Sequence, residues 1–491
     1  MAEEVALFPP AAKRVRWDDS VVEGSHSQVE REASRPPGVL QQSVGRLCAC
    51  ANDAIRLLSV SADAEQCGQR GAEYKPEFTH QLFDKERIEG YADGEVTIRV
   101  LYSATSLHFL VKINTSDADA TREAEILSKL SKALPPKGDY STDESEFMQL
   151  LEERQKDFKP PGTRVHEYKR GKKPFAVYRS TGEDPGAQEY HHRSQSLAPW
   201  FIETADRVDL NDDRWEVFYL FEEEVSREVL GEKWRPAAFV GYFTVFGFRN
   251  PVKGVSLRVC QALLLPQYQR QGHGQALLTF LYDVARAREG VFEITAEDPA
   301  PGFEKLRNLV DARVLRDHNV FPKNLLSAGT FQRPSKETVQ EAHKAVKLTV
   351  SQVEIGFDVL KARDVPAPAT PVTSIVTTAT TRDTAPEPCP NNATNAADAS
   401  ATAAIKPTTP ETAHGEGMPP GANADEGEEK RKPYRLMVKR RLLKRYGEEL
   451  ATDAPTRKRQ LEELYRQVEG VYLSLGAKLK AEEEGKVPER S

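Results

Sequence analysis

The stretch 257–299 limits the fold of this chain more than any other part of the sequence. An apolar, strand-like run ends at Pro266, the turn 269–274 has the sequence QRQGHG, and apolar residues then recur at helical spacing. A second strand-like run, 291–296, follows and ends beside Glu297. The order strand, glycine turn, helix, strand predicts that the two glycines lie at a helix N-terminus, whose free N–H groups suit a pyrophosphate.

The glycine turn alone is a weak signal, because glycines before a helix are often simple turn formers. A dinucleotide-binding turn needs a third glycine and a Walker loop needs Gly-Lys-Ser/Thr, and neither pattern is present. The order Gln-x-x-Gly-x-Gly between a strand and a helix resembles the acetyl-CoA-binding signature of the GCN5-related N-acetyltransferase superfamily. Five separated segments narrow the resemblance to the type B histone acetyltransferase catalytic subunits: PEFTHQLF at 76–83, WFIETA at 200–205, QGHG at 271–274, ITAEDP at 294–299 and YRLMVKRRLL at 434–443.

The resemblance covers most of residues 46–362 and 433–491, and it implies an α+β fold. A mixed, mostly antiparallel N-acetyltransferase sheet with flanking helices is expected between an α+β N-terminal domain and a helical C-terminal module. Two segments lack the aromatic and apolar content needed for a core and are predicted to be disordered. The expected limits are 1–45 for a disordered tail, 46–199 for the N-terminal domain, 200–315 for the catalytic domain, 316–363 for the first part of the helical module, 364–432 for a disordered Ala/Thr/Pro-rich insert, and 433–491 for the basic and amphipathic second part.

Apolar patterns also predict individual strands and helices. Strands are expected at 96–100 and 107–111, as a hairpin-like pair, and at 215–221 and 238–246, as antiparallel members of the catalytic sheet. Helices are expected within 121–156, 336–362 and 461–475. The segment 164–196, rich in Lys, Arg, Tyr and His, carries no such pattern.

Charge and cysteine content exclude several classes of protein. With a net charge of −7 the chain has no general affinity for nucleic acid, and sequence-specific nucleic acid binding is not expected. The five cysteines lack zinc spacing, so no metal is expected and the thiols are expected to be free in a reducing compartment. There is no apolar run of the length that a membrane span needs, and no signal peptide pattern, so an intracellular protein without a membrane partner is expected.

The resemblance implies how the cofactor acetyl-CoA is held. The two strands that flank the glycine turn splay apart, the pantetheine arm lies between them, and a backbone N–H near Leu264 holds the tetrahedral oxyanion. His273 is expected to contact a phosphate, and Ala300 departs from the small polar residue usual in the family. The implied cofactor-binding residues are Ala262, Leu263, Leu264, Gln269, Arg270, Gln271, Gly272, His273, Gly274, Gln275 and Phe303.

Acetyl transfer to a lysine needs a base, because a free lysine has a pKa of about 10.4 and is mostly protonated at neutral pH. The resemblance implies that Glu297 is the general base and that Asp298 and Glu203 lie beside it. From spacing alone, a Glu-Asp pair before a proline is more typical of a solvated strand end or a helix cap.

The substrate implied by the resemblance is a newly synthesised histone tail, that of the fourth core histone, presented with its partner histone. Trp215, Phe246, Gly247 and Phe248 are the implied substrate-binding residues, and eleven Asp or Glu against three Arg or Lys between Glu203 and Glu232 predict an acidic surface for a basic tail. A WD-repeat histone chaperone subunit is the implied partner, and the nucleus and cytoplasm are the implied locations. Two alternatives stay open: a catalytically weak histone-binding subunit with the same fold, and an N-acetyltransferase for another amine.

Overall fold

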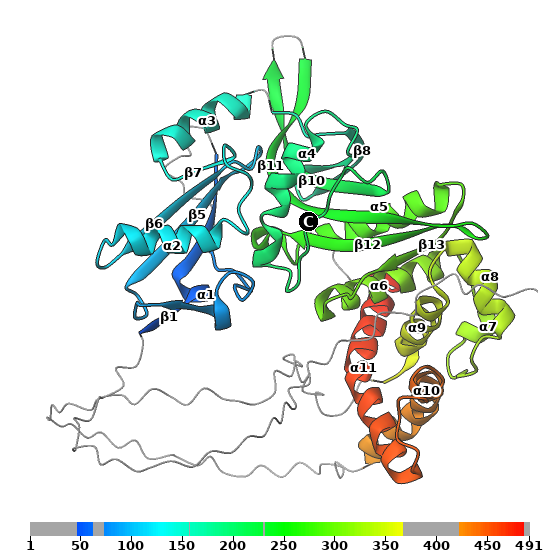
Figure 1. The fold of residues 1–491 in the computed structure, drawn as a ribbon. Helices are drawn as coiled ribbons and strands as arrows, with labels where there is room; N and C mark the ends of the chain where they lie inside the picture. The colour runs from blue at the N-terminus through cyan, green and yellow to red at the C-terminus, as the bar shows by residue number, and fades with distance from the viewer. Residues whose placement is uncertain (1–46, 62–72, 157, 229–230, 367–421, 486–491) are drawn as a thin grey trace, which may run out of the picture. The chain divides into compact units, whose positions relative to one another are not determined.

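The structure, a computed structural model, describes residues 47–61, 73–156, 158–228, 231–366 and 422–485. The predicted tail 1–45 and most of the predicted insert 364–432 therefore lie outside the described residues. In the described part, a five-stranded sheet, a six-stranded sheet and a separate strand pair are flanked by helices (Figure 1). The α+β class is confirmed, and none of the helices in these ranges is both long enough and apolar enough to cross a membrane.

The five-stranded sheet belongs to the N-terminal part of the chain and has the strand order β3-β2-β5-β6-β7. In β5, buried Val96, Ile98 and Val100 alternate with more exposed residues, as expected for a strand with one face in a core. β5 pairs antiparallel with β6, which confirms the predicted hairpin. The bounds are β1 Cys48–Cys50, α1 Ala51–Ala54, β2 Ile55–Val60, β3 Glu73–Tyr74, β4 Arg87–Glu89, β5 Val96–Ser103, β6 Phe109–Thr115, α2 Ala120–Leu130, β7 Tyr140–Ser141 and α3 Glu144–Lys156.

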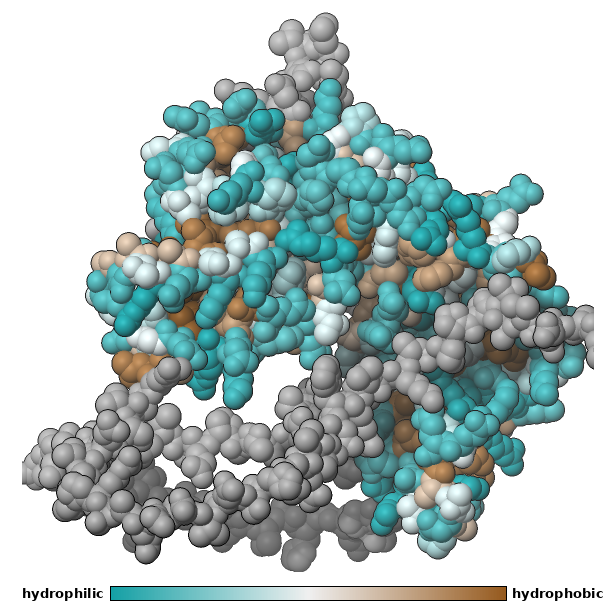
Figure 2. Space-filling view, viewed as in Figure 1, coloured by the Kyte–Doolittle hydropathy of each residue, from teal (hydrophilic) through white to brown (hydrophobic). Residues whose placement is uncertain are grey.

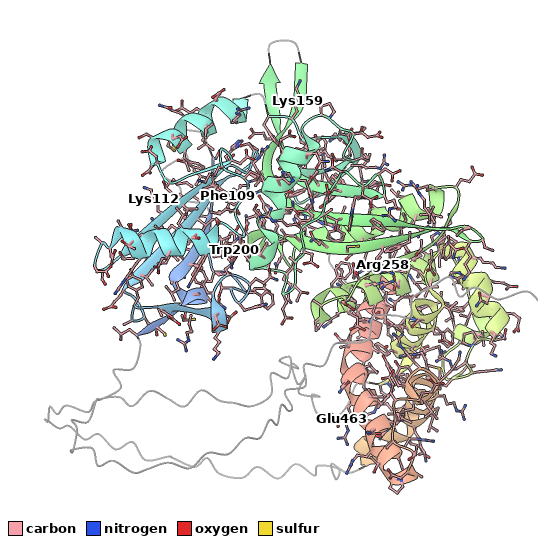
Figure 3. All side chains as sticks on the ribbon, viewed as in Figure 1. Phe109, Lys112, Lys159, Trp200, Arg258 and Glu463 are labelled. Atoms are coloured by element: carbon pink, nitrogen blue, oxygen red, sulfur yellow. The ribbon has the colours of Figure 1, made fainter. Side chains whose placement is uncertain are left out.

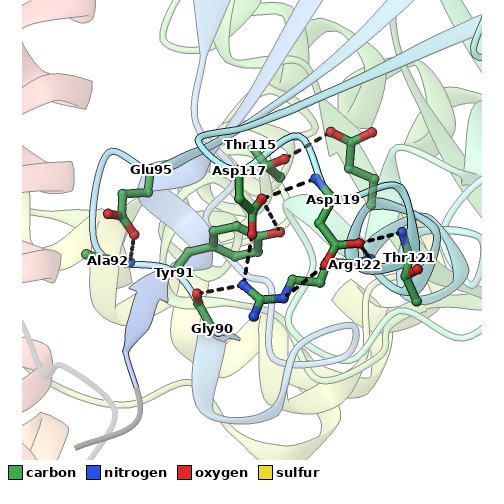
Figure 4. Close-up of polar contacts among 10 residues, drawn as sticks. Gly90, Tyr91, Ala92, Glu95, Thr115, Asp117, Asp119, Thr121 and Arg122 are labelled. Atoms are coloured by element: carbon green, nitrogen blue, oxygen red, sulfur yellow. Dashed lines mark hydrogen bonds and ion pairs between the residues drawn. The ribbon is translucent and has the colours of Figure 1, made fainter.

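The start of α2 shows how local polar contacts fix a helix on this sheet. Asp119 is the N-cap, and its carboxylate accepts hydrogen bonds from the backbone N–H groups of Thr121 and Arg122 (Figure 4). Arg122 reaches back to the carboxylate of Asp117 at 3.0 Å and donates to the carbonyl of Gly90 at 3.3 Å. The helix start is thereby tied to the turn that precedes β5.

The six-stranded sheet has the order β13-β12-β11-β10-β9-β8, and all neighbours are antiparallel except β12 and β13. This is the mixed, mostly antiparallel sheet expected from the sequence. Strands β8 and β9 come from the polar segment 164–196, for which no strand was predicted. The bounds are β8 Thr163–Arg170, β9 Lys173–Ser180, α4 Ala187–Gln195, β10 Trp215–Glu228, β11 Gly231–Asn250, β12 Gly254–Leu264, α5 His273–Ala287, β13 Val291–Ala296 and α6 Pro301–Asp317.

Both faces of this sheet are buried, and they contribute to different hydrophobic cores. On β10, Phe218 and Leu220 pack with α5, α6 and the C-terminal helices, whereas Val217, Tyr219 and Phe221 pack with α4 and the N-terminal sheet. Side chains alternate between the two faces of a strand, so one continuous apolar run serves both cores. Hydrophilic side chains cover most of the visible surface (Figure 2).

Trp200, labelled in Figure 3, joins two of the sequence segments that carry the resemblance. It is 1% exposed, at the end of the 3-10 turn Ala198–Trp200, and its carbonyl accepts hydrogen bonds from the N–H groups of Glu77 and Phe78. Gln81 also donates to the carbonyl of Glu203 at 2.6 Å. The segments 76–83 and 200–205 are therefore in direct contact, although more than a hundred residues separate them.

The C-terminal helices differ from the prediction in two places. The single helical pattern expected over 336–362 is two helices, because Lys347 adopts a left-handed conformation with φ 57° and ends the first. The second difference lies at residue 422, where α10 begins inside the predicted insert; Ala, Glu and Lys, which favour helices, are frequent there. The bounds are α7 Lys323–Leu326, α8 Lys336–Val346, α9 Val350–Lys361, α10 Ala422–Tyr446 and α11 Ala454–Glu483.

A buried carboxylate holds this helical module together. Asp358 on α9 is 0% exposed and accepts hydrogen bonds from Arg333 at 2.8 Å and from Arg441 of α10 at 2.6 Å. Tyr434 of α10 donates to the carbonyl of Asp358 at 3.1 Å. A buried charge is costly unless it is paired and hydrogen-bonded, so these contacts fix α10 against α9.

Candidate active site

The parallel pairing of β12 with β13 ends in the middle of β12. The last paired residues are Val259 and Ala296, and the N–H of Glu297 donates to the carbonyl of Val259 at 2.9 Å. Strand β12 continues to Leu264, where it pairs with Gly241 of β11 on its other side. The backbone edge of β12 from Cys260 to Leu264 that faced β13 has no strand beside it in the described structure. Hydrogen-bonding groups are therefore exposed along this edge.

A β-bulge marks the point where the strands separate. Thr244 of β11 lies opposite Gln261 and Val245 lies opposite Val259, so Cys260 is the extra residue. Gln261 is held by three hydrogen bonds: its N–H donates to the hydroxyl of Thr244 at 2.9 Å, its side-chain oxygen accepts from Tyr242 at 2.9 Å, and its amide donates to the carbonyl of Asp206 at 2.6 Å. The last bond fastens the segment that follows Glu203 to the bulge.

The glycine turn lies at the far end of the same strand. Gln269 donates to the carbonyl of Leu264 at 3.0 Å, which fixes the turn against the end of β12. Gly272 is the N-cap of α5 with φ 87°, a conformation that residues with a Cβ rarely adopt. A Cβ on Gly274 would lie 3.0 Å from Leu306 and 3.3 Å from Leu264. The turn therefore needs both glycines, and the N–H groups of the first turn of α5 have no acceptor within the helix.

The structure corrects the role expected for the His273 side chain. The residue is 1% exposed, its Nδ1 lies 2.8 Å from the hydroxyl of Tyr168, and its ring packs 4.4 Å from that of Phe175. Burial lowers the pKa of His273 to about 4, so the ring is neutral at physiological pH. The imidazole points into the core, because the first turn of an amphipathic helix must cover the sheet, and only the backbone N–H of His273 remains for a phosphate.

Arg170 at the end of β8 supplies a cation at the turn that the sequence did not indicate. Its guanidinium donates to the carbonyl of Gly272 at 3.2 Å, and the Nε atom is buried with no partner among the described residues. A Cβ on Gly272 would approach this guanidinium at 3.2 to 3.4 Å, so the glycine also makes room for the arginine. The residue comes from a strand that lies about a hundred positions earlier, and no local pattern marks it.

The candidate catalytic carboxylates lie where β13 ends. The Glu297 side chain is 50% exposed, and Arg258 of β12 approaches it at 3.7 Å. Burial, and then the neighbouring Glu297 carboxylate, raise the pKa of the Cys260 thiol to about 12. Asp298 has φ 28°, a strained conformation of the kind that clusters at functional sites. Glu203 is exposed, and the described structure contains no contact between its side chain and that of Glu297.

The aromatic residues expected to contact substrate form one continuous row, in which Phe246 is buried, Trp215 is half-buried and Phe248 is exposed. Trp215 lies opposite Phe246 with ring centroids 4.7 Å apart, and Phe248 is 4.7 Å from Phe246. The guanidinium of Arg258 lies 4.3 Å from the centre of the Phe248 ring. Gly247 donates its N–H to the carbonyl of Arg214 at 3.0 Å. The Arg258 contact shows that the Phe248 ring can accept a cation, and Arg258 also lies next to Glu297.

The acidic surface predicted between Glu203 and Glu232 is partly neutralised. The side chain of Glu223 is 1% exposed and paired with Arg164, while Glu216 is paired with both Arg179 and Arg288. Further pairs among the described side chains of this stretch are Asp212–Arg214, Asp213–Arg249 and Glu222–Lys173. Five of the eleven acids are therefore paired within the protein, three of them on β10, and the count of charges in the sequence overstated the acidity available to a partner.

Two further predicted residues lie on the helix after Glu297. Phe303 in the first turn of α6 has its ring 5.8 Å from that of Phe243 and faces the hydrophobic core that includes α5. Ala300 is the N-cap of α6 and, having no polar side chain, makes no cap hydrogen bond. No group of His, Cys, Asp and Glu side chains in the described ranges is arranged to hold a metal ion.

Comparison with known proteins places this geometry in a family. The family described as the N-terminus of the histone acetyl transferase HAT1 matches residues 47–203. The human histone acetyltransferase type B catalytic subunit is 31% identical over 296 residues, which cover 58% of this chain and 68% of the human protein. The chain belongs to the family of type B histone acetyltransferase catalytic subunits.

Other members of the type B family agree with this assignment. The Mycosarcoma maydis subunit is 31% identical over 313 residues, covering 57% of this chain and 68% of its own length. Two Dictyostelium discoideum members are 27% and 28% identical, and the chain spans 63% and 58% of their lengths. Among the site residues, a local pattern marked the glycine turn, and the resemblance to the family marked the carboxylates and the aromatic residues. Gln261 and Arg170 become visible only through their tertiary contacts.

Proposed function

We propose that this chain transfers the acetyl group of acetyl-CoA to the ε-amine of a lysine in a histone tail. The observation that carries the proposal is the open backbone edge of β12, which has the glycine turn at one end and Glu297 at the other. This edge offers hydrogen-bonding groups to an extended ligand, as a neighbouring strand would. Membership of the type B family supports the same reaction.

Acetyl-CoA would lie along this edge as a co-substrate. We assign its pantetheine amides to the backbone of Ala262, Leu263 and Leu264, and its pyrophosphate to the N–H groups of 270–275. The position of Gly272 as the N-cap of α5 supports this assignment, because the N–H groups of the first turn of the helix have no acceptor within it. We assign Phe303 to the apolar side of the cofactor.

The chemistry needs one proton acceptor and one site for negative charge. Glu297 takes a proton from the lysine Nζ, the nitrogen then bonds to the thioester carbonyl carbon, and an N–H near Leu264 stabilises the resulting oxyanion. Collapse of this intermediate breaks the C–S bond and releases CoA as the thiolate, and the nitrogen gives up its second proton to solvent to leave the neutral amide. Asp298 and Glu203 are assigned to supporting positions around the base.

The substrate follows from the aromatic row and from the family. A basic tail can lie across Trp215, Phe246 and Phe248, with a cation over the Phe248 ring in the place that Arg258 now occupies. We propose the tail of the fourth core histone, presented with its partner histone, and a WD-repeat histone chaperone as a second subunit. The nucleus and cytoplasm are the proposed locations.

A direct test incubates the full chain with acetyl-CoA and a mixture of recombinant core histones, and maps acetylated lysines by mass spectrometry. The proposal expects acetylation concentrated on the tail of one histone and absent without enzyme. Histone binding without acetylation would instead favour a non-catalytic subunit with the same fold. Acetylation of unrelated amines at equal rates would favour an N-acetyltransferase of a different specificity.

A further inference from the structure

Two cavities lie side by side on the C-terminal helical module, away from the Glu297 end of β13. One has a volume of about 670 Å³ and is lined by the start of β13, the C-terminal half of α8 and the start of α9. The other has a volume of about 390 Å³ and is lined by α8, α9 and α10. Gln340 and Val350 line both cavities, so the two form a single groove. We call it the α8–α10 groove.

The α8–α10 groove is strongly basic. Three lysines line the first cavity and five Lys or Arg side chains line the second, against one glutamate in each. The whole chain has a net charge of −7, so the charge of this groove is opposite in sign to that of the chain. Solubility alone does not require positive charges to gather in a concave site of a negatively charged protein.

Several of these cations have no carboxylate partner. Arg333 and Arg441 form ion pairs with Asp358, and the Nζ of Lys444 lies 3.2 Å from the carboxylate of Glu354. Lys347 donates to two backbone carbonyls, those of Ala285 and Arg288. The other four form no ion pair within the described part of the chain: Lys253, Lys336, Lys344 and Arg440. Their positive charges are therefore available to a partner.

Helix geometry arranges these cations in two rows. Lys336, Gln340 and Lys344 are spaced by four residues and share one face of α8. Arg440 and Lys444 are spaced in the same way on α10, on the other side of the groove. Lys253, from the turn before β12, extends the row at the end of the first cavity. An extended ligand could meet cations from both sides.

The lining between the rows is partly apolar. Val291 and Phe292 line the first cavity, Val339 lines the second, and Val350 lines both. A nucleic acid backbone would favour an array of cations without apolar residues or carboxylates between them, and Glu293 and Glu354 would repel its phosphates. A peptide with both carboxylates and apolar side chains matches the lining better.

We infer that the α8–α10 groove binds an acidic peptide segment of a partner protein, in which apolar side chains are interspersed among Asp and Glu. The apolar side chains would enter the two cavities, while the carboxylates meet Lys336, Lys344 and Arg440. This interaction is separate from the proposed acetyl transfer, because the groove contacts β13 at its first three residues, Val291 to Glu293, whereas Glu297 follows the last residue of the strand.

Fluorescence anisotropy with the full chain tests this inference. The probe is a fluorescein-labelled decapeptide of Asp and Glu containing two Phe residues, and the test variant carries Lys344→Glu and Arg440→Glu. We expect saturable binding to the unaltered protein at near-physiological salt, and about tenfold weaker binding to the variant. The matched control carries Lys458→Glu and Arg459→Glu, which reverse two exposed charges on α11 outside the groove.

The outcomes are distinct. Loss of affinity in the groove variant alone, at an unchanged melting temperature, supports the inference. Equal loss in the control variant would overturn it, since the attraction would then be general. A labelled duplex DNA that binds more tightly than the peptide and loses affinity in the same variant would also overturn it, in favour of a nucleic acid surface. If Phe→Ala changes in the probe leave the affinity unchanged, the apolar cavities are not used and the proposed ligand class is wrong.

Discussion

Carboxylates at two places in the central sheet have opposite surroundings. On the interior strand β10, Glu216 is paired with Arg179 and Arg288, and Glu223 is paired with Arg164 and accepts from Tyr178. At the end of the edge strand β13, Glu297 is half exposed and has one guanidinium at 3.7 Å. The cations beside β10 come from β8, from β9 and from the end of α5, whereas the end of the splayed strand has, among the described residues, only Arg258 of β12 beside it. A carboxylate available for chemistry is therefore identified by its place in the sheet rather than by local acidic content.

The largest expected effect comes from removing the available carboxylate. Glu297→Gln should lower kcat on a histone-tail peptide by about 100-fold or more, because proton removal from the amine loses its acceptor. The KM for acetyl-CoA should change little, since the base does not bind the cofactor. Steady-state kinetics at pH 7 measure both values, and a near-normal kcat would move the role of base to another group, first Asp298.

The same Glu→Gln substitution at Glu223 of β10 should lower the stability of the fold and leave kcat nearly unchanged. Glu223→Gln should lower the free energy of unfolding by about 2 kcal/mol, less than for a fully buried pair because Arg164 is partly exposed. Urea unfolding measures the loss, while kcat should stay within about twofold. Glu167→Gln is the control, because that exposed partner of the same Arg164 should contribute under about 1 kcal/mol. A tenfold loss of kcat in Glu223→Gln would show that this paired carboxylate also serves catalysis, and the distinction between it and Glu297 would be wrong.

The buried His273 side chain at the glycine turn should make the stability of the protein depend on pH. His273 has its pKa lowered by burial from 6.5 to about 4, so its neutral form favours the folded state. The stability it contributes is present above pH 6.5 and is lost as pH falls toward 4, by about 2 kcal/mol at pH 5. Urea unfolding at pH 7 and pH 5 should therefore show a smaller pH difference for His273→Phe than for the unaltered chain, and an equal difference would show that other groups cause it.

Alkylation of Cys260 should report on the charge of Glu297. The raised pKa of the thiol, about 12, predicts very slow reaction with iodoacetamide at pH 8. Glu297→Gln removes one cause of the increase, so the rate at Cys260 should rise by roughly threefold. Peptide mass spectrometry follows this site, with Cys48 and Cys50 as internal references. An unchanged alkylation rate would show that the Glu297 carboxylate does not raise the pKa of the Cys260 thiol.

The smallest effect is expected from salt. Because Glu216, Glu222 and Glu223 of β10 are paired within the protein, the KM for a tail peptide should rise by less than about threefold between low and physiological ionic strength. The charge count of the sequence alone would predict a steeper rise. A rise of about tenfold or more would show that these ion pairs open to receive the tail.

Local patterns in the sequence predicted the glycine turn and the hairpin of β5 and β6, because each depends on residues within one stretch. The edge where β12 and β13 separate was implied only by the resemblance to the family. Strands β8 and β9 were missed because their polar residues alternate without a long apolar run, although Phe175 and Val177 are buried. Gln261 and Arg170 were missed for a different reason, since their partners, Asp206 and Gly272, are fixed only by the fold.

The buried Asp358 has a consequence for chain length. It joins α9 to Arg441 of α10, and between those helices the chain passes through residues 362–421. Because this contact, rather than the length of the connection, fixes the helices, the cost of a longer connection is only loop-closure entropy, about 0.6 kcal/mol for each doubling. The connection is accordingly a place where the chain can lengthen or shorten among relatives, and where a reporter domain can be inserted, with little effect on the helices at either end.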